Sequence, residues 1–242
     1  MKKEIQILYE DEDIVAVDKP AGLVVHSDGR TKEPTLSDWV LEHYPDTRDV
    51  GEPIELSGGG EIMKYGIVHR LDRETSGVIL VAKNQDAFLF LKRQFQDRKI
   101  KKVYRAIVYG NFKESRGTVD KPIGKSKKDF RVWAVAGTRG TLRDAVTEYK
   151  VLCGAKDFSY VEVYPKTGRT HQIRVHMKAI QRPVVCDRLY APKNDCALGM
   201  ERVALHALSI GFFLRGGVEI KVVAPLPEDF KTALRCIGCS NI

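Results

Sequence analysis

The chain has 242 residues, of which 43% are hydrophobic and 30% charged, a composition typical of a globular protein with a full hydrophobic core. Its longest apolar runs, such as residues 78–82, have the length of a strand and exclude a membrane-spanning helix. The N-terminal lysines are followed at once by acidic residues, so no secretory signal is visible. We therefore expect a single domain, residues 1–242, in the cytoplasm.

The hydrophobic pattern predicts an α+β fold with mainly antiparallel strands. The N-terminal part should form strands at 5–9 and 14–19, a helix from Thr35 to Tyr44, and an irregular surface loop at 45–66. The remainder should form a strand at 78–82, a helix at 84–98, strands at 102–110, 131–135, 144–153 and 159–165, a helix at 170–180, and strands at 203–214 and 218–224. The 170–180 helix should bring His171, Arg174 and Lys178 onto one face.

The net charge of +8 is unevenly distributed. Residues 1–62 hold 6 Lys and Arg against 15 Asp and Glu, whereas residues 63–242 hold 34 against 17. Basic side chains concentrate at 92–105, 121–143 and 166–188, interleaved with aromatic residues. Such runs are usually solvated faces, but three of them in one chain favour a polyanionic partner such as nucleic acid.

Five cysteines, an odd number, argue against a disulfide framework. Cys236 and Cys239 have the spacing of a metal-binding pair, but no second pair lies nearby to complete a site. We expect these two thiols to be reduced and at the surface.

Asp72 is the most informative residue. It lies between Arg70 and Arg73 in the run His69–Gly77, directly ahead of an apolar strand. The neighbouring arginines favour the ionised carboxylate, which could then act as a nucleophile or a base. The alternative interpretation is a salt-bridged surface loop.

The run HRLDRETSG at His69–Gly77 resembles the HRLDxxTSG signature of the RluA-type pseudouridine synthase family. Four other segments resemble further blocks of the family, in the family's order. They are DKPAGL at 18–23 with His26, KVYRA at 102–106 with Val108 and Gly110, TGRTHQIRVH at 167–176, and APLP at 224–227 with Phe230. The resemblance spans about residues 5 to 230.

This resemblance implies a pseudouridine synthase catalytic fold and an enzyme that uses no cofactor and no metal. Such an enzyme flips a uridine out of structured RNA and re-attaches its base through carbon. Asp72 would attack the base or sugar, or remove a proton. Tyr104 would stack on the uracil and share in proton transfer, although a core tyrosine is the alternative. Arg174 would pair with Asp72 and hold its charge.

The resemblance also implies a set of RNA contacts. Arg70 would fill the space left by the flipped base or contact neighbouring bases; contacts with phosphate or Asp72 are the alternative. The expected RNA-binding residues are Arg70, Arg73, Lys102, Arg169, His171 and Lys178. His69, His171 and His176 should be structural rather than metal ligands, because the last two are five residues apart.

Two features depart from the family pattern. Cys186-Asp187 stands where the family commonly has Gly-Asp, which suggests an altered turn near Tyr190. The loop at 51–64, with three consecutive glycines, is longer than usual and could be an RNA-contacting insertion or a disordered loop. We also expect no accessory RNA-binding domain at the N-terminus.

Three functions fit these observations. The first is an active, monomeric synthase that acts on ribosomal or transfer RNA and has no membrane partner. The second is an RNA-binding or RNA-folding protein with a vestigial catalytic site. The third is an unrelated nucleic-acid-binding sheet protein, which basic composition alone would allow. The ordered motifs favour the first.

Overall fold

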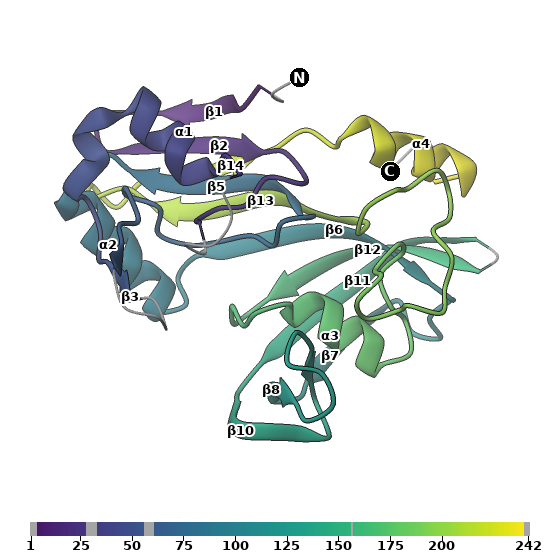
Figure 1. Cartoon of the computed structure of the whole chain (residues 1–242). Helices are drawn as coiled ribbons and strands as arrows, with labels where there is room; N and C mark the ends of the chain where they lie inside the picture. The colour runs from purple at the N-terminus through teal and green to yellow at the C-terminus, as the bar shows by residue number, and fades with distance from the viewer. Residues whose placement is uncertain (1–3, 28–32, 56–60, 156, 240–242) are drawn as a thin grey trace. The chain divides into compact units, whose positions relative to one another are not determined.

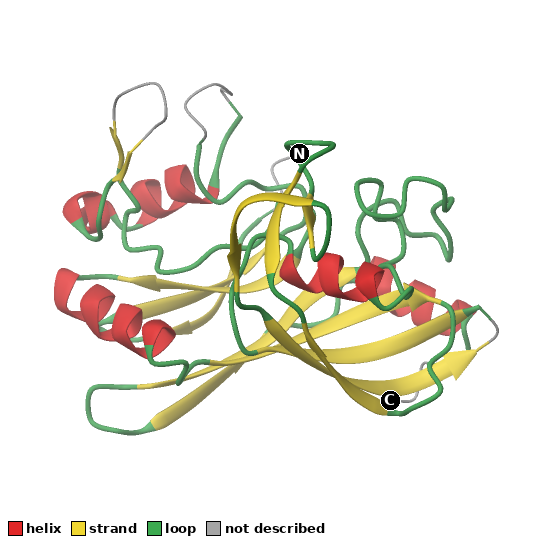
Figure 2. Ribbon diagram, turned by 90° about the horizontal axis from the view of Figure 1, so that it is seen from below, coloured by secondary structure: helices red, strands yellow, loops and turns green. Residues whose placement is uncertain are grey.

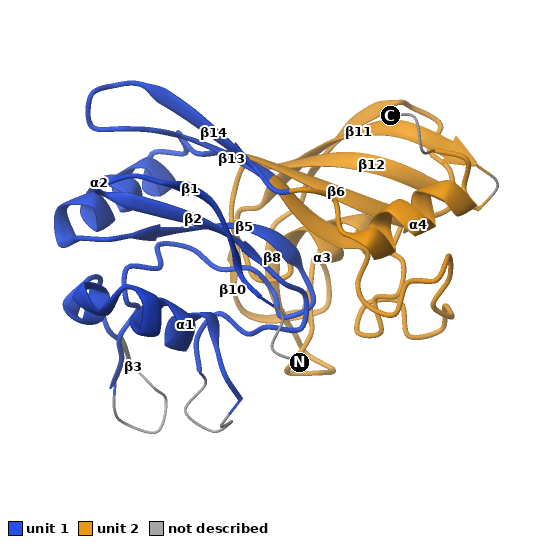
Figure 3. Cartoon of the chain, turned by 90° about the horizontal axis from the view of Figure 1, so that it is seen from above, with its two compact units in different colours: residues 1–101, 209–224 blue, residues 102–208, 225–242 orange. Residues whose placement is uncertain are grey.

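The structure is a computed structural model that describes residues 4–27, 33–55, 61–155 and 157–239. The chain forms two compact units (Figure 3). Unit 1 comprises Met1–Lys101 and Ser209–Ala224, and unit 2 comprises Lys102–Leu208 and Pro225–Ile242. Within the described ranges, no helix is long and apolar enough to cross a membrane.

Unit 1 is built on antiparallel strands (Figure 1). Its elements are β1 (Gln6–Glu10), β2 (Ile14–Lys19), α1 (Leu36–His43), η1 (Pro45–Asp49), β3 (Ile54–Glu55), β4 (Glu61–Ile62), β5 (Ser76–Ala82), α2 (Gln85–Gln96) and β14 (Glu219–Val223). β2 pairs with β1 on one side and β5 on the other, while β14 pairs with β13 (Leu205–Phe213). Every residue of β5 is buried, as expected for a central strand.

The helices of unit 1 begin where the sequence predicts. Thr35 and Asp38 form a capping box at the start of α1, each side chain accepting a hydrogen bond from the other's backbone N–H. Asn84 caps α2 by accepting from Ala87 N at 2.9 Å. Phe88 of α2 belongs to the core of this unit.

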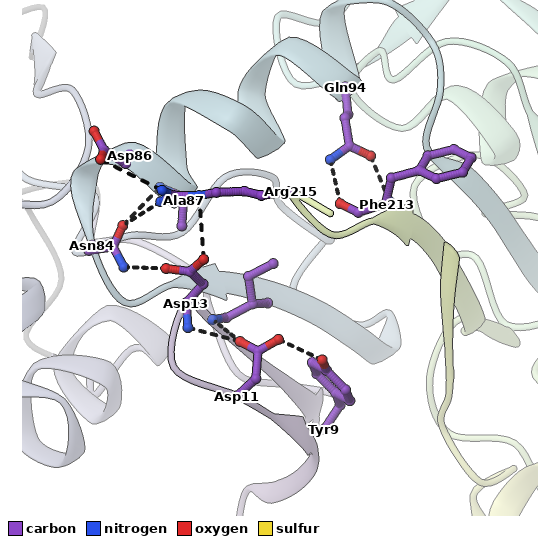
Figure 4. Close-up of polar contacts among 10 residues, drawn as sticks. Tyr9, Asp11, Asp13, Asn84, Asp86, Ala87, Gln94, Phe213 and Arg215 are labelled. Carbon is purple, nitrogen blue, oxygen red and sulfur yellow. Dashed lines mark hydrogen bonds and ion pairs between the residues drawn. The ribbon is translucent and has the colours of Figure 1, made fainter. Parts of the chain in front are cut away.

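Polar contacts tie the start of α2 to the β1–β2 turn (Figure 4). The Asn84 side-chain amide donates to Asp13 Oδ1 at 2.7 Å. Arg215, after β13, forms ion pairs with Asp13 at 3.4 Å and with Asp86 at 3.7 Å. Gln94 accepts from Phe213 N and donates to its carbonyl, which attaches α2 to β13.

Unit 2 contains the antiparallel run β6-β12-β11-β7, which is part of the nine-stranded sheet, and a small sheet in the order β10-β8-β9. Its elements are β6 (Lys101–Tyr109), β7 (Arg116–Asp120), β8 (Ile123–Ser126), β9 (Trp133–Ala134), β10 (Thr138–Arg143), β11 (Val146–Ala155), β12 (Phe158–Pro165), α3 (Gln172–Ala179) and α4 (Glu228–Cys236). The core of this unit includes residues from β6, β12, α3 and α4. The expected α+β class with mainly antiparallel strands is confirmed (Figure 2).

Several boundaries differ from the predicted ones. Within 131–135 only Trp133–Ala134 is a strand, because Asp129 and Val132 form a turn closed by the Val132 N to Asp129 O hydrogen bond. The helix predicted from Thr170 begins at Gln172, since His171 has a positive φ of 56°. The loop at 45–66 contains η1 and the β3–β4 pair; its glycine run lies outside the described residues.

The expectation of reduced surface thiols is confirmed for Cys236 and wrong for Cys239, and the expected absence of a disulfide framework is wrong. Cys153 forms a disulfide with Cys239, and Cys186 forms one with Cys196. Cys239 is therefore a buried bridging residue, and Cys236 is the exposed free thiol. Chain spacing could not reveal this, because Cys153 and Cys239 are 86 residues apart and meet only through the packing of α4.

The Cys153–Cys239 disulfide should contribute strongly to stability. Closing a loop of this length stabilises the folded chain by about 4.6 kcal/mol in the chain-entropy model. We expect Cys239→Ser to lower the Tm of the oxidised protein by about 10 °C. Cys236→Ser, three residues away, should leave the Tm unchanged. Differential scanning calorimetry checks both, and equal Tm values for Cys239→Ser and wild type would contradict the bridge.

Candidate functional site

Asp72 lies on a short turn that leads into β5. Thr75 N donates to Asp72 O at 3.1 Å, and Gly22 N donates to Arg73 O at 2.8 Å. The side chain of Thr75 is buried, whereas Asp72 is half-buried. Hydrogen bonds thus hold the backbone carbonyls of Asp72 and of the residue after it.

The Lys19 side chain stabilises this turn through a hydrogen bond to its backbone. Its ammonium group is fully buried and donates to Pro20 O at 2.9 Å, Leu23 O at 2.8 Å and Arg73 O at 3.1 Å. A buried charge is tolerated only when its donors are satisfied, and here three backbone carbonyls accept from it. Lys19 belongs to a segment that resembles a family block, but the resemblance assigns it no role. Its place before a Pro-Ala-Gly turn was the available signal.

The region around Arg70 is positively charged. Arg70 is exposed, and Arg73 forms an ion pair with Glu33 at 2.8 Å. Burial, together with the positive charges of Arg70 and Lys64, lowers the pKa of His26 to about 4. This local field favours the approach of a phosphate group.

His69 has a structural environment. Its Nε2 accepts from Leu80 N at 2.9 Å, so the ring proton resides on Nδ1. Its ring centroid lies 5.0 Å from that of Phe95. These contacts agree with the structural role expected from the sequence.

Tyr104 and Lys102 lie on β6, and their spacing of two residues places them on the same side of the strand. Tyr104 is opposite Val163 of β12 and is half-buried against the core of unit 2. Lys102 Nζ donates to Thr167 O at 3.1 Å. Burial lowers the pKa of Lys102 to about 8.

Arg174 forms a bidentate ion pair that the sequence did not predict. Its Nε and Nη2 donate to the two carboxylate oxygens of Asp187 at 2.7 and 2.8 Å. Both side chains are nearly or fully buried. The expected pairing of Arg174 with Asp72, which belongs to unit 1, stays a prediction.

The three side chains predicted to share one helix face, His171, Arg174 and Lys178, all lie next to Tyr190. Arg174 lies over the Tyr190 ring, 4.9 Å from its centroid, and Lys178 Nζ is 5.8 Å from it. His171 Nδ1 is 2.9 Å from the Tyr190 hydroxyl. Lys178 is exposed, and Arg169 Nε donates to Asp144 O at 3.0 Å.

A buried polar network explains why the 167–176 segment is so polar. Gln172 Nε2 donates to Thr147 Oγ1 at 3.0 Å, and Gln172 Oε1 accepts from Thr167 Oγ1 at 2.6 Å. His176 joins Thr147 Oγ1 and Lys121 O, each at 2.9 Å. Because the Lys121 carbonyl only accepts, His176 Nε2 carries the proton and Nδ1 accepts from Thr147. The network connects α3 to β11 and supports a structural role for His176.

The described residues contain no cluster of three or more His, Cys, Asp or Glu side chains arranged to hold a metal ion. His69 forms a hydrogen bond with a backbone N–H group, His171 with a tyrosine hydroxyl and His176 with a threonine hydroxyl.

Comparison with known proteins gives consistent results. Residues 13–179 match the sequence profile of the RNA pseudouridylate synthase family. An uncharacterized RNA pseudouridine synthase of Bacillus subtilis is 40% identical over 227 residues, which cover 93% of this chain and 70% of the relative. Ribosomal large subunit pseudouridine synthase D of Zymomonas mobilis is 35% identical, with 98% of this chain and 74% of the relative covered. The solved structure of human RNA Pseudouridylate Synthase Domain Containing 4 superposes with a TM-score of 0.74 at 26% identity, covering 96% of this chain and 92% of that chain.

The His176 network should make stability depend on pH. Burial lowers the pKa of His176 below its usual value of 6.5, because the charged ring loses its hydration, and protonation of Nδ1 would also remove the acceptor for Thr147. A lowered folded-state pKa means that this contribution is complete above about pH 6.5 and is lost as the pH falls below it. We expect His176→Gln to lose less free energy of unfolding than wild type between about pH 7.5 and about pH 5.5. Urea denaturation at both pH values measures this, and parallel losses in the two proteins would refute it.

Proposed function

The chain belongs to the RNA pseudouridylate synthase family and is an RNA pseudouridine synthase, and we propose that Asp72 is the catalytic carboxylate with which it isomerises uridine in structured RNA. The observation that carries this proposal is the turn at Asp72. The backbone carbonyl of Asp72 accepts there from Thr75 N–H, and that of Arg73 accepts from Gly22 N–H and from the buried Lys19 ammonium. These bonds hold the backbone that carries the half-buried Asp72. Preorganised positioning of this kind is what a nucleophile or base requires.

The reaction exchanges one bond for another within the same nucleotide. The bond from C1′ of the ribose to N1 of uracil breaks, and a bond from C1′ to C5 forms. The proton on C5 is lost and N1 gains one, so the atoms of the product equal those of the substrate. A carboxylate at Asp72 could attack the base or sugar, or remove a proton from the sugar; our proposal covers both routes.

Tyr104 and Arg174 complete the proposed machinery. Tyr104 offers an aromatic ring for stacking on the extruded base and a hydroxyl for late proton transfer. Arg174 carries a buried guanidinium whose orientation is already set by Asp187, so it can hold a second carboxylate with little loss of side-chain entropy. We propose Asp72 as that second carboxylate.

The RNA would be bound through basic side chains on both units. Arg70 is exposed within a positive region, and Lys178 is exposed beside Tyr190. We propose the same role for Arg73, Lys102, Arg169 and His171. Extruding a uridine costs a few kcal/mol of stacking, which phosphate contacts and stacking on Tyr104 would offset. We propose that the protein acts as a monomer in the cytoplasm.

We propose large-subunit ribosomal RNA as the substrate class, because curated relatives named for the ribosomal large subunit match at 34% and 35% identity. Purified protein incubated with fragments of this RNA should form pseudouridine at defined positions. Transfer RNA transcripts at equal concentration should be modified at least about 10-fold more slowly, since a site specific for one RNA fold loses contacts on another. Equal rates on both RNAs would contradict this choice of substrate.

Asp72→Asn keeps the shape of the side chain and removes its reactive carboxylate. We expect turnover to fall by at least about 10³-fold with RNA affinity retained. Tritium release from [5-³H]uridine RNA measures turnover, filter binding measures affinity, and circular dichroism confirms folding. Glu74→Gln makes the same change of charge two residues away and should stay close to wild type. Substantial turnover by Asp72→Asn would remove Asp72 from the mechanism.

A further inference from the structure

We propose that His26 binds the substrate by accepting a hydrogen bond from a ribose 2′-hydroxyl of the RNA. The inference rests on the proposed function and deepens it, because it names the group by which this site would distinguish RNA from DNA. His26 belongs to unit 1, as do Arg70 and Asp72. Its role follows from which of its two ring nitrogens is already occupied.

The backbone that carries His26 is held at two points. Ser37 N, in α1, donates to Val25 O at 3.0 Å. Gly22 N, at the other end of the segment, donates to Arg73 O at 2.8 Å. His26 is half-buried next to this fixed backbone. Its ring is therefore placed by α1 and by the turn of Asp72 before any RNA binds, which lowers the entropic cost of a contact.

The Ser37 hydroxyl decides which ring nitrogen of His26 carries the proton. Ser37 Oγ donates to Val25 O at 2.9 Å, and a carbonyl oxygen can only accept. The single hydroxyl proton is thus used, so Ser37 Oγ accepts from His26 Nδ1, which lies 2.7 Å away. A neutral ring protonated on Nδ1 has a lone pair on Nε2. His26 therefore presents a hydrogen bond acceptor at Nε2.

This acceptor is accessible. In the part of the chain that the structure describes, the hydrogen bond of the His26 ring is the one made by Nδ1. An atom without a partner is either buried or reachable by solvent, and Nε2 of His26 is not among the buried unpaired atoms of these residues. A substrate group can thus reach Nε2 without displacing a protein partner.

The surroundings of His26 are cationic while the ring itself is neutral. Burial and the positive charges of Arg70 and Lys64 hold the pKa of His26 at about 4, so the ring is uncharged at neutral pH. Arg70 is exposed, and Lys64 is half-buried with its Nζ 3.9 Å from Glu52. An uncharged acceptor therefore lies beside cations that attract phosphate.

One group of an RNA strand matches this arrangement. The phosphate and ring oxygens of the backbone only accept hydrogen bonds, and the 2′-hydroxyl is the backbone group that can donate one. It is attached to the carbon next to the one that carries the 3′-phosphate. A phosphate drawn to Arg70 therefore brings a hydroxyl donor with it, whereas a DNA strand would bring none.

The chain contains a matched control histidine. His43, at the end of α1 in the same unit, also uses Nδ1, which is 2.9 Å from Trp39 O. It is exposed and its ring stacks on Trp39, with 4.3 Å between the ring centroids. His43→Asn thus removes the same kind of ring without touching any residue of the proposed RNA contact.

The test pairs His26→Asn with RNA that lacks single 2′-hydroxyls. The asparagine amide can still donate to Ser37 but has no acceptor at the position of Nε2. Large-subunit ribosomal RNA fragments carry one 2′-deoxy nucleotide each, at the target uridine or at each neighbouring nucleotide in turn. Filter binding measures affinity and tritium release measures turnover, with the full chain in each case.

Wild-type protein should lose affinity by about 10-fold at one of these positions, the usual worth of a hydrogen bond between neutral groups. His26→Asn should bind the unmodified RNA about 10-fold more weakly and lose less than about 2-fold on the same deoxy substitution. His43→Asn should keep the wild-type loss. A histidine that only supported the fold would weaken binding of both RNAs in parallel, so equal deoxy effects in wild type and His26→Asn at every position would overturn the proposal.

His26→Phe covers the case in which circular dichroism shows His26→Asn to be unfolded. It keeps a ring of similar size without either nitrogen, so the deoxy effect should again disappear, and a wild-type deoxy effect in His26→Phe would reject the contact. The proposed function is tested separately. Wild type that binds RNA with a His26-dependent deoxy effect but forms no pseudouridine rejects the proposed function alone, whereas an active wild type without that effect rejects the contact alone.

Discussion

In unit 1, a fully buried ammonium group joins the loop after β2 to the turn before β5 through hydrogen bonds. Lys19 ends β2 and donates to three backbone carbonyls, of which one belongs to Arg73 beside the candidate catalytic aspartate. Burying this charge is unfavourable unless the carbonyls stay in position, so the loop after β2 and the turn before β5 must fold together. The satisfaction of this buried charge therefore helps to place the backbone that carries Asp72.

In unit 2 a buried group of the opposite charge is likewise satisfied by hydrogen bonds. The buried Asp187 carboxylate is satisfied by backbone N–H groups and by Arg174, and Tyr190 packs on the guanidinium. Close by in the chain, Gln172 and His176 connect α3 to β11 through fully hydrogen-bonded side chains. In both units, hydrogen bonds to a buried charged group thus hold a candidate catalytic residue or the backbone beside it, Asp72 in unit 1 and Arg174 in unit 2. Such preorganisation reduces the reorganisation needed when the substrate binds.

Local signals in the sequence were sufficient for much of the fold. The start of α1 at Thr35 and the strand β5 could be predicted from the hydrophobic pattern, and the capping box of Thr35 with Asp38 agrees with that helix start. Helix α4 was missed although Glu228 and Asp229 follow Pro227, a typical helix start. The partner of Arg174 could not be predicted, since Asp187 is 13 residues away in a turn without periodicity. The disulfides likewise depend on long-range packing.

The central claim is that this chain converts a uridine of RNA into pseudouridine at a carboxylate held by the Lys19-anchored turn. The most direct test is a single-turnover experiment with purified protein in excess over a large-subunit ribosomal RNA fragment, followed by position-resolved pseudouridine mapping. We expect pseudouridine at defined positions of the RNA, with the other uridines unchanged. RNA that is bound by the protein while every uridine remains unconverted would contradict it and would favour an RNA-binding protein with a vestigial site.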